Sequence, residues 1–304
     1  MATSIALKWA VEHSPRLAKI SLFPSKQPKN VAHTKPEVHK LLAPLYEHPF
    51  HQYLLPTLSI RELACSLPVL ESAPLKALSM LPYLERLTMY KTSDRIISES
   101  QETLLPEHSF PSLKYLRLNL PTSANVNWAL RALAILANLK NLTVDIKHLD
   151  AYDETLTKHK FFSALTHATQ LEALSIVFDA DSMKDMLEIG NMKVFHDVLG
   201  KLPLKSAFFM PLILPFPDIT SMNFNPAWSN VTRLLVPAAR VFFHTLPIFS
   251  QLPRLEYLMV CLGITTRLLK EIPKPDQELS LRTLEGSPES SVWHDEADLD
   301  QVVS

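Results

Sequence analysis

Glycine is scarce in this chain. Only 4 of its 304 residues are glycine, whereas average usage of about 7% would give roughly 21. Phosphate-binding loops, dinucleotide-binding fingerprints and nucleophile elbows need closely spaced glycines, because only glycine lets the backbone turn tightly or approach a ligand closely. Here Gly190, Gly200, Gly263 and Gly286 are spread along the sequence. This argues against P-loop NTPases, Rossmann dehydrogenases, protein kinases and ordinary α/β-hydrolases.

Cysteine is also scarce, and the chain has neither an excess of one charge nor a long apolar run. Two cysteines make no disulfide framework, which favours reduced thiols in the cytoplasm or nucleus. Charges at Lys8, Glu12 and Arg16 interrupt any apolar region of a signal peptide, and the longest apolar stretch, 208–216, is too short to span a bilayer. With 30 Lys+Arg and 31 Asp+Glu, the chain lacks the basic excess of a nucleic-acid binder. We therefore expect a cytoplasmic or nuclear protein that binds neither membrane nor nucleic acid.

Leucine and proline are abundant instead, with 52 and 24 residues. Much of the leucine belongs to a recurring pattern in which an apolar residue is followed by others three and five positions later. Clean copies begin at Leu84, Leu113, Leu139, Leu171 and Leu255, and weaker ones at Leu17, Leu55, Leu204, Val231 and Leu281. Several copies have a proline two residues upstream, where it precedes the strand and removes no hydrogen bond from a sheet. Five evenly spread clean copies indicate a structural repeat rather than general leucine usage.

The segments between the copies have helical spacing. Ala129, Leu133 and Ala137 recur at intervals of four on one helical face, and residues 161–168, 192–199 and 238–249 show the same periodicity. A short strand followed by a helix, at a period of about 20–29 residues, is the layout of a leucine-rich repeat. We therefore predict an α/β solenoid (horseshoe) of about nine or ten degenerate, irregular repeats over residues 1–284, with short parallel strands on the concave face and helices on the convex face. Residues 285–304 are acidic and rich in serine, and they are predicted to form a disordered tail.

Four segments carry a resemblance to a known family. The segments LPYLERLTMY, FPSLKYLRLNL, LANLKNLTVDI and LPRLEYLMV resemble irregular leucine-rich repeats of the ribonuclease-inhibitor-like kind. Their Pro-x-Leu-Glu/Lys-x-Leu form is similar to fungal F-box/leucine-rich-repeat proteins. The Asn or Cys that usually follows each block is absent in register, and no F-box is recognisable. The resemblance implies a possible substrate-recognition subunit of an F-box-type ubiquitin ligase, with a Skp1-type adaptor as partner only if an F-box is missing from this chain.

The concave face is the predicted binding site. Alternate residues of each strand point outward from the core. They are polar with Arg and Tyr in the first half of the chain and apolar in the second, which is typical of an interface. The residues predicted to bind a protein partner are Arg86, Tyr115, Arg117, Phe208, Met210, Tyr257 and Met259. At the copy beginning at Leu55 the outward residues would be Thr57, Ser59 and Arg61. A misregistered copy at Leu204, which would bury Phe208 instead, is the alternative.

Other candidates for chemistry are weak. His48 and His51 are spaced as metal ligands on a helix, but Pro49 lies between them and no Cys or acidic cluster accompanies them. Residues 179–185 resemble the start of a calcium loop but lack its glycine, and Cys261 is expected to be a buried thiol. We predict a non-enzymatic protein-interaction module with no catalytic residue, cofactor or metal. A globular α/β enzyme of unknown chemistry is the alternative.

Overall fold

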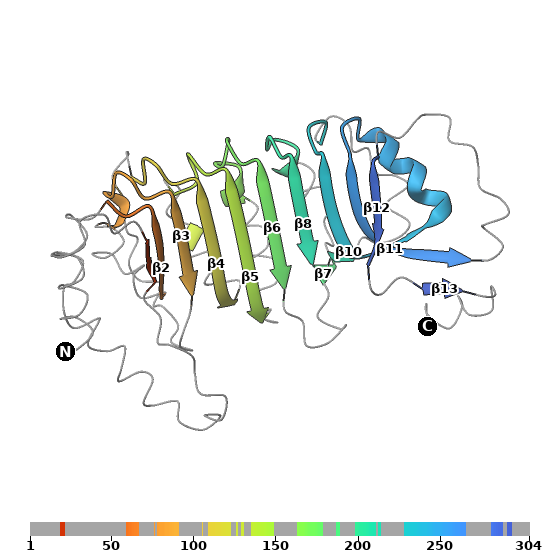
Figure 1. Ribbon diagram of the computed structural model, residues 1–304, viewed down its shortest axis with the longest axis horizontal. Helices are drawn as coiled ribbons and strands as arrows, with labels where there is room; N and C mark the ends of the chain where they lie inside the picture. The colour runs from red at the N-terminus through yellow and green to blue at the C-terminus, as the bar shows by residue number, and fades with distance from the viewer. Residues whose placement is uncertain are drawn as a thin grey trace, which may run out of the picture.

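The main element of the protein is an eleven-stranded sheet, seen in a computed structural model (Figure 1). The structure describes residues 19–21, 59–66, 76, 78–90, 105, 109–122, 126, 129–130, 135–148, 163–178, 187–188, 198–210, 212–213, 228–265, 281–287 and 291–293. All structural statements below concern these residues.

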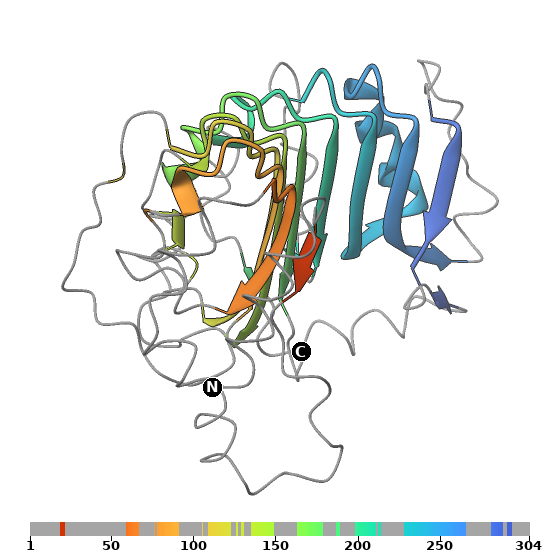
Figure 2. The same ribbon diagram turned by 60° about the vertical axis from the view of Figure 1, so that its left-hand side comes forward.

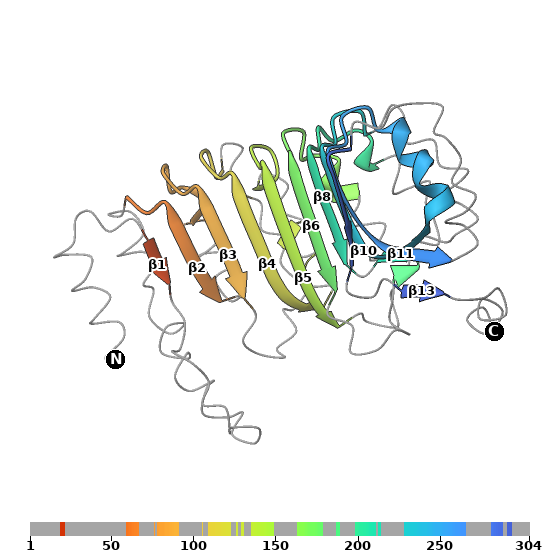
Figure 3. The same ribbon diagram turned by 45° about the vertical axis from the view of Figure 1, so that its right-hand side comes forward.

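The strands follow one another in chain order, and every pair is parallel. They are β1 (Lys19–Ser21), β2 (Glu62–Ser66), β3 (Arg86–Tyr90), β4 (Tyr115–Thr122), β5 (Asn141–His148), β6 (Ala173–Phe178), β8 (Ser206–Met210), β10 (Arg233–Phe242), β11 (Tyr257–Thr265) and β12 (Thr283–Gly286). Figure 3 shows β1 at the N-terminal edge of the sheet. The eleventh strand, β13 (Ser291–Trp293), pairs with the end of β11, and β7 (Leu187–Glu188) pairs with β9 (Leu212–Ile213) in a separate small sheet.

The strand register reproduces the sequence repeat. The middle apolar residue of each copy pairs with the middle residue of the next, in one unbroken line across the sheet. This line runs Ile20, Leu63, Leu87, Leu116, Leu142, Leu174, Ala207, Leu234, Leu258 and Leu284. The predicted fold, a leucine-rich-repeat solenoid built on parallel strands, is therefore confirmed.

The core is a column of these apolar side chains. In the repeat of β3, the three pattern residues Leu84, Leu87 and Met89 are at most 1% exposed. Fully burying one such side chain stabilises a protein by about 1.5–3 kcal/mol. Because each repeat stacks its apolar residues only on those of its neighbours, the repeats hold one another in place.

The turns that enter the strands need no glycine. The carbonyl of Lys140 accepts hydrogen bonds from the backbone N–H groups of Glu172 and Ala173, at 2.8 and 2.9 Å. The same double acceptance recurs at Arg61, Glu85, Lys114, Glu172, Lys205, Thr232 and Glu256. No described glycine has a positive φ. The low glycine content is thus compatible with regular turns.

Proline supports the same turns. The N–H of Leu113 bonds to the carbonyl of Phe110, and Leu255 bonds in the same way to Leu252. Pro111 and Pro253 therefore lie at the second position of these turns, where a φ fixed near −65° is favourable. Figure 2 shows the entry turns lying side by side along one edge of the sheet.

Two sequence-based expectations are wrong. The copy in β2 begins at Ile60 and not at Leu55, because Leu63 pairs with Leu87. The helix predicted over 238–249 is instead the second half of β10, up to Phe242, followed by the 3-10 helix η5 (Phe243–Gln251). Residues 283–286 and 291–293 form the strands β12 and β13, so the sheet continues past residue 284, where the solenoid was expected to end.

The helical content of the described chain is small. Besides η5, helical residues occur at 76, 78–79, 126, 129–130, 135, 163–165 and 198–199, all in segments between strands. In β10 the register shifts between Val236 and Arg240, and Pro237 lies in this bulge. Beyond the bulge, β10 continues beside the end of β11, which turns away from the main sheet (Figure 1).

Candidate protein-binding face

The outward residues of the sheet form three rows. We call the surface made by these rows the strand face. The first row contains Glu62, Arg86, Tyr115, Asn141, Ala173, Ser206, Arg233, Tyr257 and Thr283. The second contains Ala64, Thr88, Arg117, Thr143, Ser175, Phe208, Leu235, Met259 and Glu285, and the third contains Asn119, Asp145, Val177 and Met210.

All seven predicted site residues lie on the strand face. Arg86, Tyr115 and Tyr257 are in the first row, Arg117, Phe208 and Met259 in the second, and Met210 in the third. Tyr115 and Met210 are 36% and 43% exposed. From β3 to β11 there are six strand spacings, or about 29 Å at about 4.8 Å per strand. The seven residues therefore span a surface of the size of a peptide or domain contact.

The register of β8 decides between the two predictions for Phe208. Its neighbours Ala207 and Phe209 point into the core and are 0% and 3% exposed, while Phe208 is only half-buried. The copy beginning at Leu204 is therefore in the predicted register, and the alternative that buries Phe208 is wrong.

The strand face at β2 differs from the prediction. Its outward residues are Glu62 and Ala64, whereas Arg61 lies in the turn before the strand, Ser59 precedes that turn, and Thr57 lies outside the described residues. Sequence reasoning missed Glu62, which forms an ion pair with Arg86 on the strand face. The signal that could have found it is the overlapping copy Ile60-x-x-Leu63-x-Cys65.

In the first half of the strand face, the arginines form ion pairs with carboxylates of the same face. Arg86 lies 3.6 Å from the carboxylate of Glu62, and its guanidinium stacks 4.3 Å from the ring centroid of Tyr115. Arg117 donates from two nitrogens to one oxygen of Asp145, at 2.7 and 3.2 Å. Exposed pairs of this kind stabilise a fold by about 0–1 kcal/mol. Their main effect here is to leave this half with little unbalanced charge.

The second half is apolar apart from one cation, Arg233, and one carboxylate, Glu285. Its rows carry the half-buried side chains of Val177, Phe208, Leu235 and Met259 together with the more exposed Met210. The guanidinium of Arg233 lies 4.9 Å from the ring centroid of Tyr257.

A tyrosine hydrogen bond borders this apolar half. The Tyr257 hydroxyl donates to the carboxylate of Glu285, and this bond, with partial desolvation, raises the pKa of Tyr257 above its ordinary value. The positive charge of Arg233 acts in the opposite direction on the same pKa. The phenol therefore stays neutral at any physiological pH.

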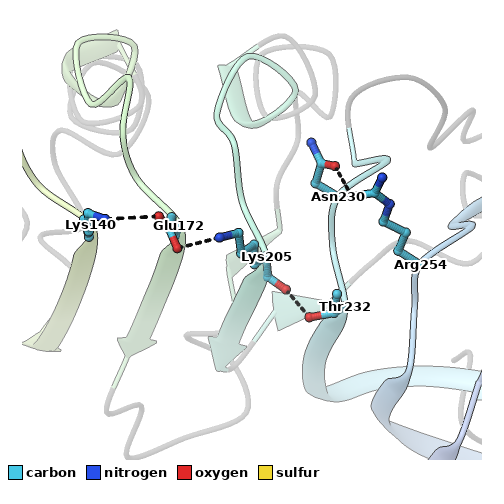
Figure 4. Close-up of polar contacts among 6 residues, drawn as sticks. All are labelled: Lys140, Glu172, Lys205, Asn230, Thr232 and Arg254. Carbon is cyan, nitrogen blue, oxygen red and sulfur yellow. Dashed lines mark hydrogen bonds and ion pairs between the residues drawn. The ribbon is translucent and has the colours of Figure 1, made fainter.

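A second set of charges lies along the entry turns and not on the strand face. Figure 4 shows Glu172 between Lys140 and Lys205, at 3.5 and 2.8 Å from their ammonium groups. The hydrogen bond and charge of Lys205 lower the pKa of Glu172. Arg254 donates to the side-chain oxygen of Asn230 at 3.0 Å. Because each contact joins neighbouring repeats, this row stabilises their alignment.

The described residues offer few alternatives for chemistry. They include no group of three His, Cys, Asp or Glu residues that could hold a metal ion. His48, His51 and residues 179–185 lie outside the described part of the chain. Cys261 is 4% exposed, which confirms the predicted buried thiol. No helix within the described ranges is long and apolar enough to cross a membrane.

These features define the class of protein. Parallel strands in one register, apolar columns and double-acceptor turns make a leucine-rich-repeat solenoid. Among solved structures, the chain is similar in fold to human 5T4 (Wnt-activated inhibitory factor 1, trophoblast glycoprotein), with a TM-score of 0.45 and 16% sequence identity over 78% of this chain and 82% of that one. No protein-family model matches the sequence, and no curated protein matches it significantly.

Proposed function

We propose that this protein is a non-enzymatic interaction module that binds a protein partner on the strand face, which the sequence predicts to be concave. The observation that carries the proposal is the apolar half of this face. Five apolar side chains there remain in contact with solvent, and Met210 is 43% exposed. Contiguous apolar surface bordered by polar residues is typical of protein interfaces, in which Tyr, Arg, Phe and Met are enriched.

The composition of the strand face supports direct recognition by surface complementarity. The proposed contact residues are Arg86, Tyr115, Arg117, Phe208, Met210, Tyr257 and Met259. Between Tyr115 and Arg233 the outward residues of the first row are small or of moderate size, such as Ala173 and Ser206. Because the strands are already paired in one sheet, little backbone entropy should be lost on binding.

Affinity capture with a matched control tests the proposal. The full chain is compared with the variants Phe208→Glu and Met80→Glu, both of which add one negative charge. Met80 is 63% exposed in the turn before β3, away from the strand face. We expect Phe208→Glu, alone and combined with Tyr257→Ala, to lose partners that the wild type and Met80→Glu retain. An unchanged set of partners for a Phe208→Glu chain with a native circular dichroism spectrum would contradict the proposal.

A role in ubiquitin ligation is a narrower form of this proposal. Its support is the resemblance of the Pro-x-Leu-Glu/Lys-x-Leu segments to fungal F-box/leucine-rich-repeat proteins. In that role the strand face would hold the substrate in the cytoplasm or nucleus, and an F-box outside this chain would bind a Skp1-type adaptor. Co-precipitation with that adaptor from cells is the expected result, and its absence would leave only the general interaction role. The alternative of a globular α/β enzyme requires a fold other than the solenoid found here.

A further inference from the structure

We propose that the segment recognised by the strand face is acidic and apolar: a carboxylate of the partner binds Arg233, and a neighbouring apolar side chain packs on Phe208 and Leu235. This inference rests on the proposed function and specifies the partner's chemistry. The described ion pairs of the strand face lie in its first half, whereas the arginine of its second half, Arg233, forms none with a described carboxylate.

Two arginines of the first row make a matched comparison. Arg86 stacks on Tyr115 of the next strand, and Arg233 stacks in the same way on Tyr257 of its next strand. Arg86 also has the carboxylate of Glu62 at 3.6 Å. Arg233 has no ion pair with any described carboxylate within 4 Å, although it is exposed.

The two described carboxylates in the second and third rows of the face bond to side chains other than Arg233. The carboxylate of Glu285 accepts the hydroxyl hydrogen of Tyr257, and Asp145 is held by Arg117. A guanidinium positioned over an aromatic ring presents its N–H groups in a fixed fork, and this fork matches a carboxylate better than an ammonium group does. The exposed guanidinium of Arg233 is therefore the group on this part of the face that is complementary to a carboxylate.

The apolar neighbours of Arg233 determine which kind of side chain lies beside the acidic group in the partner segment. Leu235 lies two residues further along the same strand, about 7 Å away along the face, and it pairs with Phe208 on one side and Met259 on the other. In an extended segment, residues i and i+2 have this spacing and point the same way. The face thus fits a segment in which Asp or Glu and a large apolar residue alternate.

Selection of peptides on the full chain tests this chemistry. The probe is a phage-displayed library of random nine-residue peptides, which reach about 30 Å when extended. Three chains are compared: the wild type, Arg233→Glu, and Lys201→Glu as a control with the same change of net charge. Lys201 is exposed in the turn region before β8, outside the strand face. Binding of selected peptides is then measured by fluorescence anisotropy at two salt concentrations.

The expected result is an enrichment of Asp or Glu two positions from Leu, Ile, Phe or Met on the wild type and on Lys201→Glu. Arg233→Glu should instead select Lys or Arg at that position. Wild-type peptides should bind Arg233→Glu at least about tenfold more weakly, because the variant removes a charge-assisted hydrogen bond and places a like charge in its position. Their affinity for the wild type should fall at high salt.

Several results would overturn the inference. Selection of neutral or basic peptides by the wild type, selection of no peptide, or the same acidic preference on Arg233→Glu would each do so. A dimer in sedimentation velocity that Arg233→Glu dissociates would assign this face to a second copy of the chain. If Phe208→Glu abolishes capture of protein partners while the charge preference does not follow residue 233, the proposed function stands and only the acidic segment is wrong.

Discussion

Phe110 is the one described residue with a positive φ, at 54°, and it is aromatic. The left-handed region costs a residue other than glycine about 1–2 kcal/mol. Two contributions offset this cost. The ring is 1% exposed in the core, and the Phe110 N–H donates to the carbonyl of Ser79 at 2.7 Å. The packing of the side chain therefore maintains a strained turn before β4.

This balance predicts an unusual order of stability at position 110. Phe110→Ala should lower the free energy of unfolding by about 3–5 kcal/mol because it leaves a cavity. Phe110→Gly leaves a similar cavity but relieves the backbone strain, so it should be about 1 kcal/mol more stable than Phe110→Ala. Urea unfolding of the three proteins measures the difference. A glycine variant less stable than the alanine variant would show that the backbone is not strained there.

Glu172 couples stability to pH through its two lysines. Its pKa lies below the ordinary value of 4.5, chiefly because Lys205 donates a hydrogen bond to the ionised carboxylate. A lowered pKa in the folded state stabilises the protein above the unfolded pKa, and this stabilisation is lost as the pH falls through the folded pKa.

We therefore expect Glu172→Gln to be less stable than the wild type at pH 7 and to converge with it below the folded pKa. Denaturation midpoints measured from pH 7 down to pH 2 check this. The effect should be small because the group is exposed and screened by solvent. Lys205→Gln, alone and combined with Glu172→Gln, supplies a double-mutant cycle whose coupling should vanish in acid. A coupling that persists when Glu172 is protonated would contradict the ionic explanation.

At the level of elements, β2 shows where sequence reasoning fails. The stretch from Leu55 to Cys65 contains two overlapping copies of the apolar pattern that share Ile60. Pattern alone cannot choose between them, because each offers three apolar residues at the same spacing. The choice is made by pairing with β3, where Leu63 joins the line of Leu87 and the core.

The register of β2 predicts opposite outcomes at adjacent positions. Leu63 is 5% exposed, whereas Ala64 is partly exposed on the strand face. Leu63→Ala should reduce the free energy of unfolding by about 2–5 kcal/mol, and Ala64→Ser should change it by less than about 0.5 kcal/mol. Thermal or urea unfolding of both variants decides the register. A larger loss for Ala64→Ser than for Leu63→Ala would mean that β2 is shifted by one residue.

The second failure, at 238–249, has another cause. Ala238, Val241 and Phe242 fit a helical period, but a bulge at Pro237 also lets Val241 enter the sheet, where it pairs with Leu262 and is fully buried. A short apolar run is ambiguous between strand and helix. Pairing with β11 settles this case, and such pairing between distant residues is not visible in a local period.

The residues of the candidate site could be predicted from the sequence, but the ion pairs between them could not. Alternation along each strand was enough to place Phe208 and Met210 on the strand face, because the repeat fixes which residues point inward. The pairing of Arg86 with Glu62 and the lack of such a pair at Arg233 depend on which residues of neighbouring strands lie side by side. That information required the register of the sheet.

For the whole molecule, the two neighbours of a repeat determine how much it contributes to stability. β11 lies between β10 and β12, and its core residue Leu258 is 0% exposed. Among the described strands, β12 pairs only with β11. All four residues of β12 are exposed, and Leu284, at the same position of the repeat as Leu258, is 38% exposed. A solenoid is stabilised by the sum of such neighbour contacts, so its last repeat should be the weakest.

The matched pair Leu258 and Leu284 tests this view of the whole molecule. Leu258→Ala should lower the free energy of unfolding by about 2–5 kcal/mol, whereas Leu284→Ala should lower it by less than about 1 kcal/mol. Hydrogen exchange should agree, with amides of β12 exchanging by local opening and those of β4 to β6 only on global unfolding. If Leu284→Ala were as destabilising as Leu258→Ala, β12 would have to be covered in solution by a second chain. A fall in the apparent mass of Leu284→Ala in sedimentation would then reveal that chain.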